Sequence, residues 1–139
     1  MNDIHLWAVL VCALVSMVLG SIWYGPLFGK KWMEITGASN KTADERKKMQ
    51  QSAGPLYAIQ FLMSLFQAYV LAYYITVFKG ASGIDHALWI CAAFILPTVA
   101  QAAMWNNDSK KVCWSRFLIQ AGYQIILFII FGLILGTWQ

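Results

Sequence analysis

The fold is decided by FLIQAGYQIILFIIFGLILGTW, residues 117–138, a stretch that contains no charged side chain. A helix needs about 20 apolar residues to cross the hydrocarbon core of a bilayer, and a charge at the centre of that core costs at least about 2.5 kcal/mol. Residues 4–29, 49–78 and 86–107 are equally free of Asp, Glu, Lys and Arg. The sequence therefore predicts four membrane-spanning helices, at about residues 4–24, 56–78, 86–105 and 117–138.

The composition of the whole chain agrees with a membrane protein. Of its 139 residues, 60% are hydrophobic and 12% are charged, whereas soluble domains contain about 25% charged residues. Backbone polar groups must be satisfied internally in lipid, and the alternating segments typical of a membrane barrel are absent from the sequence. We therefore expect one all-α domain over residues 1–139, a four-transmembrane-helix bundle with a short amphipathic cytoplasmic helix.

Positive charges gather in two of the predicted loops. Loop 25–55 contains Lys30, Lys31, Lys41, Arg46, Lys47 and Lys48, loop 106–116 contains Lys110, Lys111 and Arg116, and the opposite side has only Lys79. Loops rich in Lys and Arg stay in the cytoplasm, so we expect both termini outside. Lys30, Lys31 and Trp32 are candidates for contact with anionic lipid headgroups. The alternative is that they only anchor the end of the first helix.

A short helix is predicted inside the first cytoplasmic loop. Thr42 and Glu45 have the spacing of a capping box, in which each side chain bonds the backbone N–H of the other residue. The helix should cover residues 43–52 and end before Gly54 and Pro55. Its basic residues Arg46, Lys47 and Lys48 form either a solvated face or a face for a partner or lipid. They do not form the interleaved basic and aromatic surface typical of nucleic-acid binding.

Uncharged polar side chains recur within the predicted spans. They are Ser16, Gln60, Ser64, Gln67, Thr98, Gln101, Gln120, Tyr123 and Gln124. An amide that faces lipid leaves polar atoms unpaired, at a large free-energy cost, so these faces should turn toward other helices. Two interpretations remain. The side chains either form hydrogen bonds between helices or line a polar cavity for a neutral or weakly polar solute.

Glycine and proline mark two further features of the spans. Gly132 and Gly136 have the spacing that lets two helix backbones approach closely, either within the chain or in a dimer. Pro97 is expected to kink the third span and to free a carbonyl in the preceding turn, which Gln101 or a neighbouring helix would satisfy.

Residues with possible metal, haem or redox chemistry are few. Asp3, His5, Asp85 and His86 could gather a divalent metal, or the two histidines could bind haem, if the first and third spans are neighbours at the outer surface. The alternative is a pair of interfacial histidines next to aspartates that cap the two helices. Cys12, Cys91 and Cys113 lack a metal or redox spacing and are expected to be free structural thiols. We expect no catalytic residue, metal or cofactor.

Several segments resemble one family of bacterial membrane proteins. Residues 23–32, WYGPLFGKKW, and residues 117–124, FLIQAGYQ, resemble signatures of the domain of unknown function 1761. Pro97, Gly132, Gly136 and Trp138 are also similar to that family, and the resemblance covers nearly the whole chain. It implies a small four-helix domain in the bacterial inner membrane, and it brings no activity and no active-site residue.

Two kinds of function follow from these features. The first is a non-catalytic protein that acts by assembly, as a structural or accessory subunit or as a homo-oligomer. The alternative is an oligomeric channel or transporter for a small neutral or weakly polar solute, lined by the polar faces. A path for ions would normally need charged groups or exposed carbonyls. The expected partners are the lipid bilayer, including anionic lipids, and a second copy or another membrane protein; nucleic acid is not expected.

Overall fold

The computed structural model describes residues 3–138, which form helices and turns without a strand. The N-terminal half contains α1 (Leu6–Ile22), a π-helical turn η1 (Trp23–Leu27), α2 (Gly29–Thr36), a 3₁₀ turn η2 (Ala38–Asn40), α3 (Ala43–Ser52) and α4 (Gly54–Val77). The C-terminal half contains α5 (Gly83–Ile90), a second π-helical turn η3 (Cys91–Ile95), α6 (Leu96–Met104) and α7 (Lys110–Trp138). The all-α class is therefore confirmed.

Four helical segments within residues 3–138 are long and apolar enough to cross a membrane. They are Leu6–Leu27, Gly54–Val77, Gly83–Met104 and Lys110–Trp138. The last segment begins well before the predicted start at residue 117, because the helix includes Lys110, Lys111 and Arg116. Charge is excluded from hydrocarbon but not from a helix, so charged residues can extend a helix beyond the lipid.

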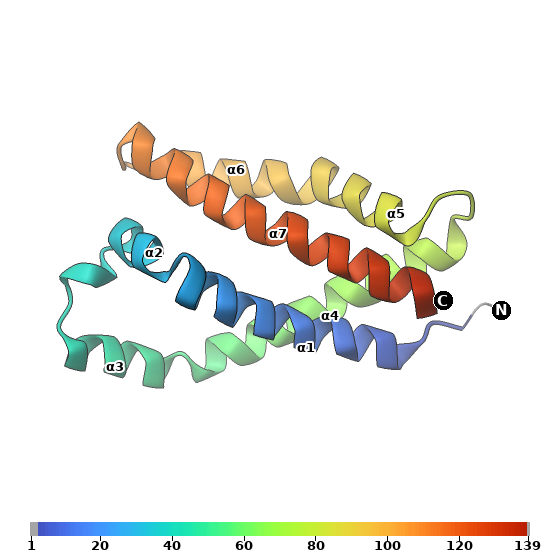
Figure 1. Ribbon diagram of the computed structural model, residues 1–139, viewed down its shortest axis with the longest axis horizontal. Helices are drawn as coiled ribbons and strands as arrows, with labels where there is room; N and C mark the ends of the chain where they lie inside the picture. Colours follow the sequence, from blue (N-terminus) through green and yellow to red (C-terminus); the bar gives the residue numbers. More distant parts are fainter. Residues whose placement is uncertain (1–2, 139) are drawn as a thin grey trace.

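The last helix, α7, lies at the centre of the molecule. It packs against α1, α5 and α6 and also touches α4, while α4 packs along α1. Figure 1 shows α7 between α1 and the α5–α6 segment, with α4 crossing behind them. One end of the molecule holds α2, α3 and the turn from α6 to α7, and the opposite end holds the start of α1, the turn at residues 78–82 and the end of α7 (Figure 1). The two basic loops thus share one end.

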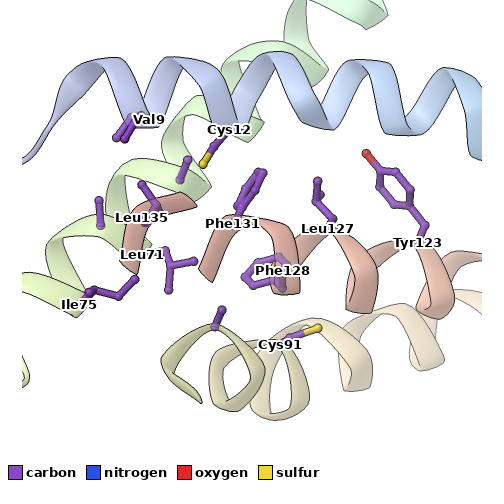
Figure 2. Packing of buried hydrophobic residues seen from close by; sticks show 14 residues of the cluster. Val9, Cys12, Leu71, Ile75, Cys91, Tyr123, Leu127, Phe128, Phe131 and Leu135 are labelled. Atoms are coloured by element: carbon purple, nitrogen blue, oxygen red, sulfur yellow. The ribbon is translucent and has the colours of Figure 1, made fainter. Parts of the chain in front are cut away.

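The core forms where α7 meets its neighbours. Leu127, Phe128, Phe131 and Leu135 of α7 are buried among residues of α1, α4 and α5. Figure 2 shows Phe131 and Tyr123 pointing from α7 toward α1. The partner helices present small buried side chains, namely Ala8, Cys12, Ala68, Ala72, Ala87 and Cys91. Small residues let membrane helices approach closely, and such packing replaces the hydrophobic drive that lipid cannot supply.

Gly132 and Gly136 are packed inside the chain, against Gly83 at the start of α5. A Cβ added at Gly132 would lie 2.7 Å from the Gly83 carbonyl oxygen and 2.7 Å from Ile84 Cα. A Cβ added at Gly136 would lie 3.1 Å from Gly83 Cα. The spacing of these glycines allows close helix packing within one chain or in a dimer. The structure contains the first of these, as the contact between α5 and α7.

The predicted caps are right at one helix and wrong at two. The Glu45 N–H donates to Thr42 Oγ1 at 3.2 Å and the Thr42 N–H donates to Glu45 Oε2 at 3.1 Å, so the capping box that opens α3 is present. At α5 the N-cap is Ser82, and Asp85 completes a second capping box instead of acting as the cap. Asp3 does not cap α1, because His5 occupies the N-cap and makes no side-chain cap bond.

Pro97 follows the π-helical turn η3. Proline removes one backbone donor and crowds the carbonyl four residues earlier, and a π-helical turn widens the helix at that point. The Leu96 N–H donates to the Cys91 carbonyl across this turn, and Thr98 Oγ1 donates to the Phe94 carbonyl at 2.7 Å. The side chain bonded within this turn is therefore that of Thr98, whereas we expected Gln101 or a neighbouring helix to satisfy the carbonyl that Pro97 frees.

Candidate binding pocket

A pocket of about 650 Å³ lies between α1, α4, α6 and α7, next to the end of α3. Its lining comes from six elements of the described chain. The residues are Ser16, Met17, Gly20 and Ser21 of α1, Tyr24 and Gly25 of η1, Gln50 of α3, Tyr57 and Gln60 of α4, Thr98, Val99 and Ala102 of α6, and Gln120, Tyr123 and Gln124 of α7. The pocket is thus at the same end of the molecule as the two basic loops.

Most of the polar residues singled out from the sequence meet in this pocket. Ser16, Gln60, Thr98, Gln120, Tyr123 and Gln124 all line it. Ser64 is buried beside it and accepts a hydrogen bond from Gln60 Nε2 at 3.4 Å. Gln67 is half-buried and Gln101 is exposed, and neither lines the pocket. The expectation that Ser64, Gln67 and Gln101 line the same cavity is therefore wrong.

The physical reason is helix placement. Helix α6 packs on α7 along one side only. Of its polar residues, Thr98 therefore reaches the pocket, whereas Gln101 lies on the exposed side of the helix. Gln101 also lies close to the end of α6 at Met104, where an amide can reach the membrane interface instead of hydrocarbon. An amide there does not need a partner from another helix.

Four hydroxyl groups of the lining donate their hydrogens to backbone carbonyls. Tyr123 Oη donates across the molecule to the Ser16 carbonyl at 2.8 Å, and Figure 2 shows this hydroxyl directed at α1. Ser16 Oγ donates to the Ala13 carbonyl at 2.7 Å, and Ser21 Oγ donates to the Met17 carbonyl at 3.0 Å. Thr98 makes the equivalent bond within α6. A hydroxyl has one hydrogen and two lone pairs, so each of these groups presents an acceptor to the pocket.

Gln124 adds an acceptor that has no protein partner. Its Oε1 atom is buried and makes no hydrogen bond to any described residue. Buried polar atoms in native structures nearly always have a partner, which can be a water molecule or a ligand. Gln124 lines the pocket, and its Oε1 is a buried acceptor without a partner among the described residues.

An aromatic cluster forms the wall on the side of α2. The Tyr24 ring lies 5.6 Å from the Tyr123 ring and 4.8 Å from the Trp32 ring, measured between centroids. Trp23 does not line the pocket. Its Nε1 donates instead to the carbonyl of Ile119 in α7 at 2.8 Å. A Cβ at Gly122 would come within 2.9 Å of the Trp23 ring, so a glycine there makes room for the indole.

The sequence did not predict this aromatic wall. It depends on η1, the π-helical turn that contains Pro26 and turns Trp23 toward α7 while Tyr24 faces the pocket. The sequence feature that could have indicated this turn is the run Trp23, Tyr24, Gly25, Pro26. In it, a proline follows two aromatic residues at the end of a predicted span. A proline at that place indicates a helix irregularity, but its geometry depends on the contact with α7.

Charged groups lie around the pocket and not in it. None of the described lining residues is charged. Arg116 pairs with Asp108 at 2.8 Å at the turn between α6 and α7. On α2, Lys30 and Lys31 are exposed, with Lys31 3.8 Å from Glu34, and Trp32 is half-buried against Tyr24. Both lysines are thus on the surface, Lys31 in an exposed ion pair, whereas the Trp32 ring is engaged within the protein.

The end of the molecule opposite the pocket does not assemble the metal cluster considered from the sequence. Within residues 3–138 no three His, Cys, Asp or Glu side chains lie close enough to hold a metal ion. His86 Nε2 lies 2.9 Å from the Phe78 carbonyl oxygen, and its ring meets the edge of Tyr74. Asp3 lies instead beside Tyr69 and Tyr73 of α4. Asp3, His5, Asp85 and His86 therefore do not gather, and Cys12, Cys91 and Cys113 are buried free thiols.

Comparison of this chain with known protein families found one matching family model. A family model described as "Protein of unknown function (DUF1761)" matches residues 7–136, which is nearly the whole chain. The match includes both segments that resemble that family, residues 23–32 and 117–124. Searches of curated proteins and of solved structures found no match.

Proposed function

Because this chain belongs to DUF1761, a family of proteins of unknown function, we propose a function from its geometry: it is a membrane protein that binds a small neutral molecule in the pocket between α1, α4, α6 and α7. Binding, without chemical conversion of the molecule, is the role we assign to this pocket. The passage of that molecule through an oligomer is compatible with it, because four helices alone enclose little space.

The main support for this proposed function is the pocket itself. Its volume of about 650 Å³ falls in the usual range of ligand sites, roughly 300–1,000 Å³. Amides and hydroxyls from four apolar helices converge on it, and its described lining bears no charge. Polar groups placed in a membrane span need partners, and Gln124 Oε1 has none within the described chain. A bound molecule would satisfy that oxygen.

The lining favours binding over catalysis. Hydroxyl nucleophiles need a neighbouring base that can accept their proton. The hydrogens of Ser16, Ser21 and Tyr123 are instead held by main-chain carbonyls. These groups are positioned to accept hydrogen bonds, which is the requirement for recognition of a ligand.

The proposed orientation places the pocket on the cytoplasmic side of a bacterial inner membrane. Apart from Lys79, the lysines and arginines of the sequence lie in or beside the two loops at the pocket end. Positively charged loops are retained in the cytoplasm during insertion. The termini would then lie outside, and the pocket would open toward the inner leaflet.

Native mass spectrometry tests the proposed function. The wild-type protein, released from lipid nanodiscs, should carry an additional neutral mass that survives gentle activation. The Gln124→Leu variant should lose that mass because it removes an unpaired acceptor from the pocket. The Gln101→Leu variant is the matched control, since Gln101 is exposed outside the pocket and should retain the mass. Equal occupancy of both variants, or a bare wild-type protein, would contradict the proposal.

Assembly as a structural or accessory subunit, or as a homo-oligomer, is the competing proposal. It draws support from the large apolar side chains that α1, α4 and η3 expose, among them Val18, Phe66 and Phe94. Lipid covers such side chains equally well. The Gly132 and Gly136 face, the usual sequence signature of a helix dimer, is already packed against Gly83. Multimers without a bound small molecule in the same mass spectra would favour assembly.

A further inference from the structure

We infer that the ligand of this pocket is an amphiphile with an uncharged head that carries several hydroxyl groups, bound through hydrogen bonds that the head donates. The inference rests on the proposed function and specifies its ligand class. A glycerol or sugar head on a single alkyl chain has this chemistry. The reasons are the hydrogen-bond direction of the lining, its neutrality and the open side of the pocket.

The first reason is that the wall offers acceptors, in addition to the amide N–H groups of its glutamines. The hydrogens of Ser16, Ser21, Thr98 and Tyr123 all point to backbone carbonyls, so lone pairs remain for the ligand. The buried Oε1 of Gln124 is a further acceptor, and it has no donor among the described residues. An ester, ether or ketone would place its own lone pairs against these atoms and leave them unpaired. A head with several O–H groups would satisfy them.

The second reason is the absence of charge in the described lining. A phosphate or an ammonium head would lose its hydration there without gaining an opposite charge, and uncompensated burial of a charge is very unfavourable. Arg116 and Asp108, at the turn between α6 and α7, neutralise each other in an ion pair of 2.8 Å. An uncharged head avoids this penalty.

The third reason is that the pocket is open at the side between α4 and α6. Helix α4 packs on α1 and helix α6 packs on α7, without a substantial contact between α4 and α6. Figure 1 shows the start of α4 well separated from the end of α6. Gln60 on α4 and Thr98 on α6 line the pocket and are also exposed. An alkyl chain could leave through this opening, where Ile59 and Phe94 offer exposed apolar surface.

Competition for a photoreactive lipid tests the ligand class. The protein is placed in phosphatidylcholine nanodiscs with a monoacylglycerol that carries a diazirine in its chain, and cross-linked peptides are identified by mass spectrometry. Unlabelled monooleoylglycerol should suppress labelling of the pocket peptides at concentrations roughly tenfold lower than methyl oleate, whose head only accepts hydrogen bonds. Octyl glucoside as a third competitor separates a sugar head from a glycerol head. Alkyl-glycoside detergents must be avoided in purification, because they would occupy the same site.

Variants at one hydroxyl give the matched controls. Thr98→Val keeps the shape of the side chain and removes an acceptor, so it should abolish most of the preference for monooleoylglycerol, and Thr98→Ser should retain it. Thr137→Val removes a hydroxyl that also bonds its own helix, 2.9 Å from the Leu133 carbonyl, but lies outside this pocket. It should behave as the wild type.

Each outcome separates this inference from the proposed function. Equal competition by monooleoylglycerol and methyl oleate at the pocket peptides would overturn the hydroxyl-head inference and leave a pocket that binds neutral amphiphiles. If neither competitor suppresses the labelling, the inference is also wrong, and the native mass spectra of Gln124→Leu and Gln101→Leu then decide whether any neutral molecule binds.

Discussion

The Tyr123 side chain joins the first and last apolar helices in the pocket half of the molecule. Its ring is buried, and its hydroxyl donates to the Ser16 carbonyl of α1 at 2.8 Å. Gly20 packs beside it, and a Cβ there would lie 3.5 Å from the Tyr123 hydroxyl, an ordinary van der Waals contact. One residue therefore combines a hydrogen bond between distant segments, an aromatic contact with Tyr24 and part of the pocket wall.

Tyr123→Phe should lower thermal stability by a small and measurable amount. The substitution keeps the ring and removes one interhelical hydrogen bond, and such bonds contribute about 0.6 kcal/mol on average in a membrane bundle. Thermal unfolding in nanodiscs, followed by circular dichroism, measures the change. Tyr69→Phe is the control, because Tyr69 is exposed on α4, and it should leave the midpoint unchanged. Equal midpoints for Tyr123→Phe and the wild type would contradict the assigned bond.

A larger effect is expected at the glycine contact. Gly132→Ala would place a methyl group 2.7 Å from backbone atoms of Gly83 and Ile84, which cannot move away as a flexible side chain can. Overpacking of this kind typically costs about 1–3 kcal/mol. Gly54→Ala is the matched control, since nothing lies within 4 Å of the added Cβ. The same thermal unfolding should show a loss for Gly132→Ala alone, and a similar loss at both sites would argue against a specific contact.

At the scale of elements, two π-helical turns set the directions of the side chains around the pocket. The Phe28 N–H donates to the Trp23 carbonyl at 3.0 Å, five residues back, around Pro26. The second turn, η3, lies directly before Pro97. Such turns are often found at functional sites. Here η1 brings Tyr24 to the pocket, and η3 precedes the part of α6 that supplies Thr98.

The α3 helix depends on its cap more than on packing. Its residues are exposed except for the half-buried Arg46, so few tertiary contacts hold it. Thr42→Ala removes the hydroxyl that accepts from the Glu45 N–H at 3.2 Å, and loss of such a cap costs about 1 kcal/mol. Hydrogen–deuterium exchange over residues 43–52 should accelerate roughly fivefold as a result. Ser39→Ala, which changes an exposed residue before the cap, should leave that exchange rate as in the wild type.

At the scale of the whole molecule, the distribution of charge and the fold agree. Alternate crossing of a membrane by these four helices would place residues 25–55 and 106–116 on one side, and those loops contain most of the Lys and Arg residues. The fold brings the same loops to one end (Figure 1). The pocket lies at that end, so the direction of insertion would decide which leaflet and which compartment it faces.

Labelling of introduced cysteines tests this orientation. In intact bacterial cells, a maleimide that cannot cross the membrane should label Ala81→Cys, and it should label Lys47→Cys only after permeabilisation. Ala81 is preferred to its neighbour Ser82 because Ser82 caps α5. The native thiols Cys12, Cys91 and Cys113 are buried, so the wild-type protein supplies the background. Labelling of Lys47→Cys in intact cells would reverse the orientation and place the pocket outside.

The sequence alone determined the four apolar helices and the start of α3, because their causes are local. Exclusion of charge from hydrocarbon marks the four apolar helices, whichever neighbours they have. The Thr42 and Glu45 spacing determines where α3 begins, because both partners of the capping box lie within one turn. Helical periodicity also put Gln120 and Gln124 on one face. That face does line the pocket.

Only the tertiary structure decided which faces meet. The contacts that build the pocket join residues far apart in the chain, as in the bonds from Trp23 to Ile119 and from Tyr123 to Ser16. Periodicity says which residues share a face but not which helix covers it, because this depends on where small residues permit close approach. Gly83 and Gly132 bring α5 against α7 in this way. For the same reason Gln124 lies in the pocket and Gln101 at the surface, although both are amides on apolar helices.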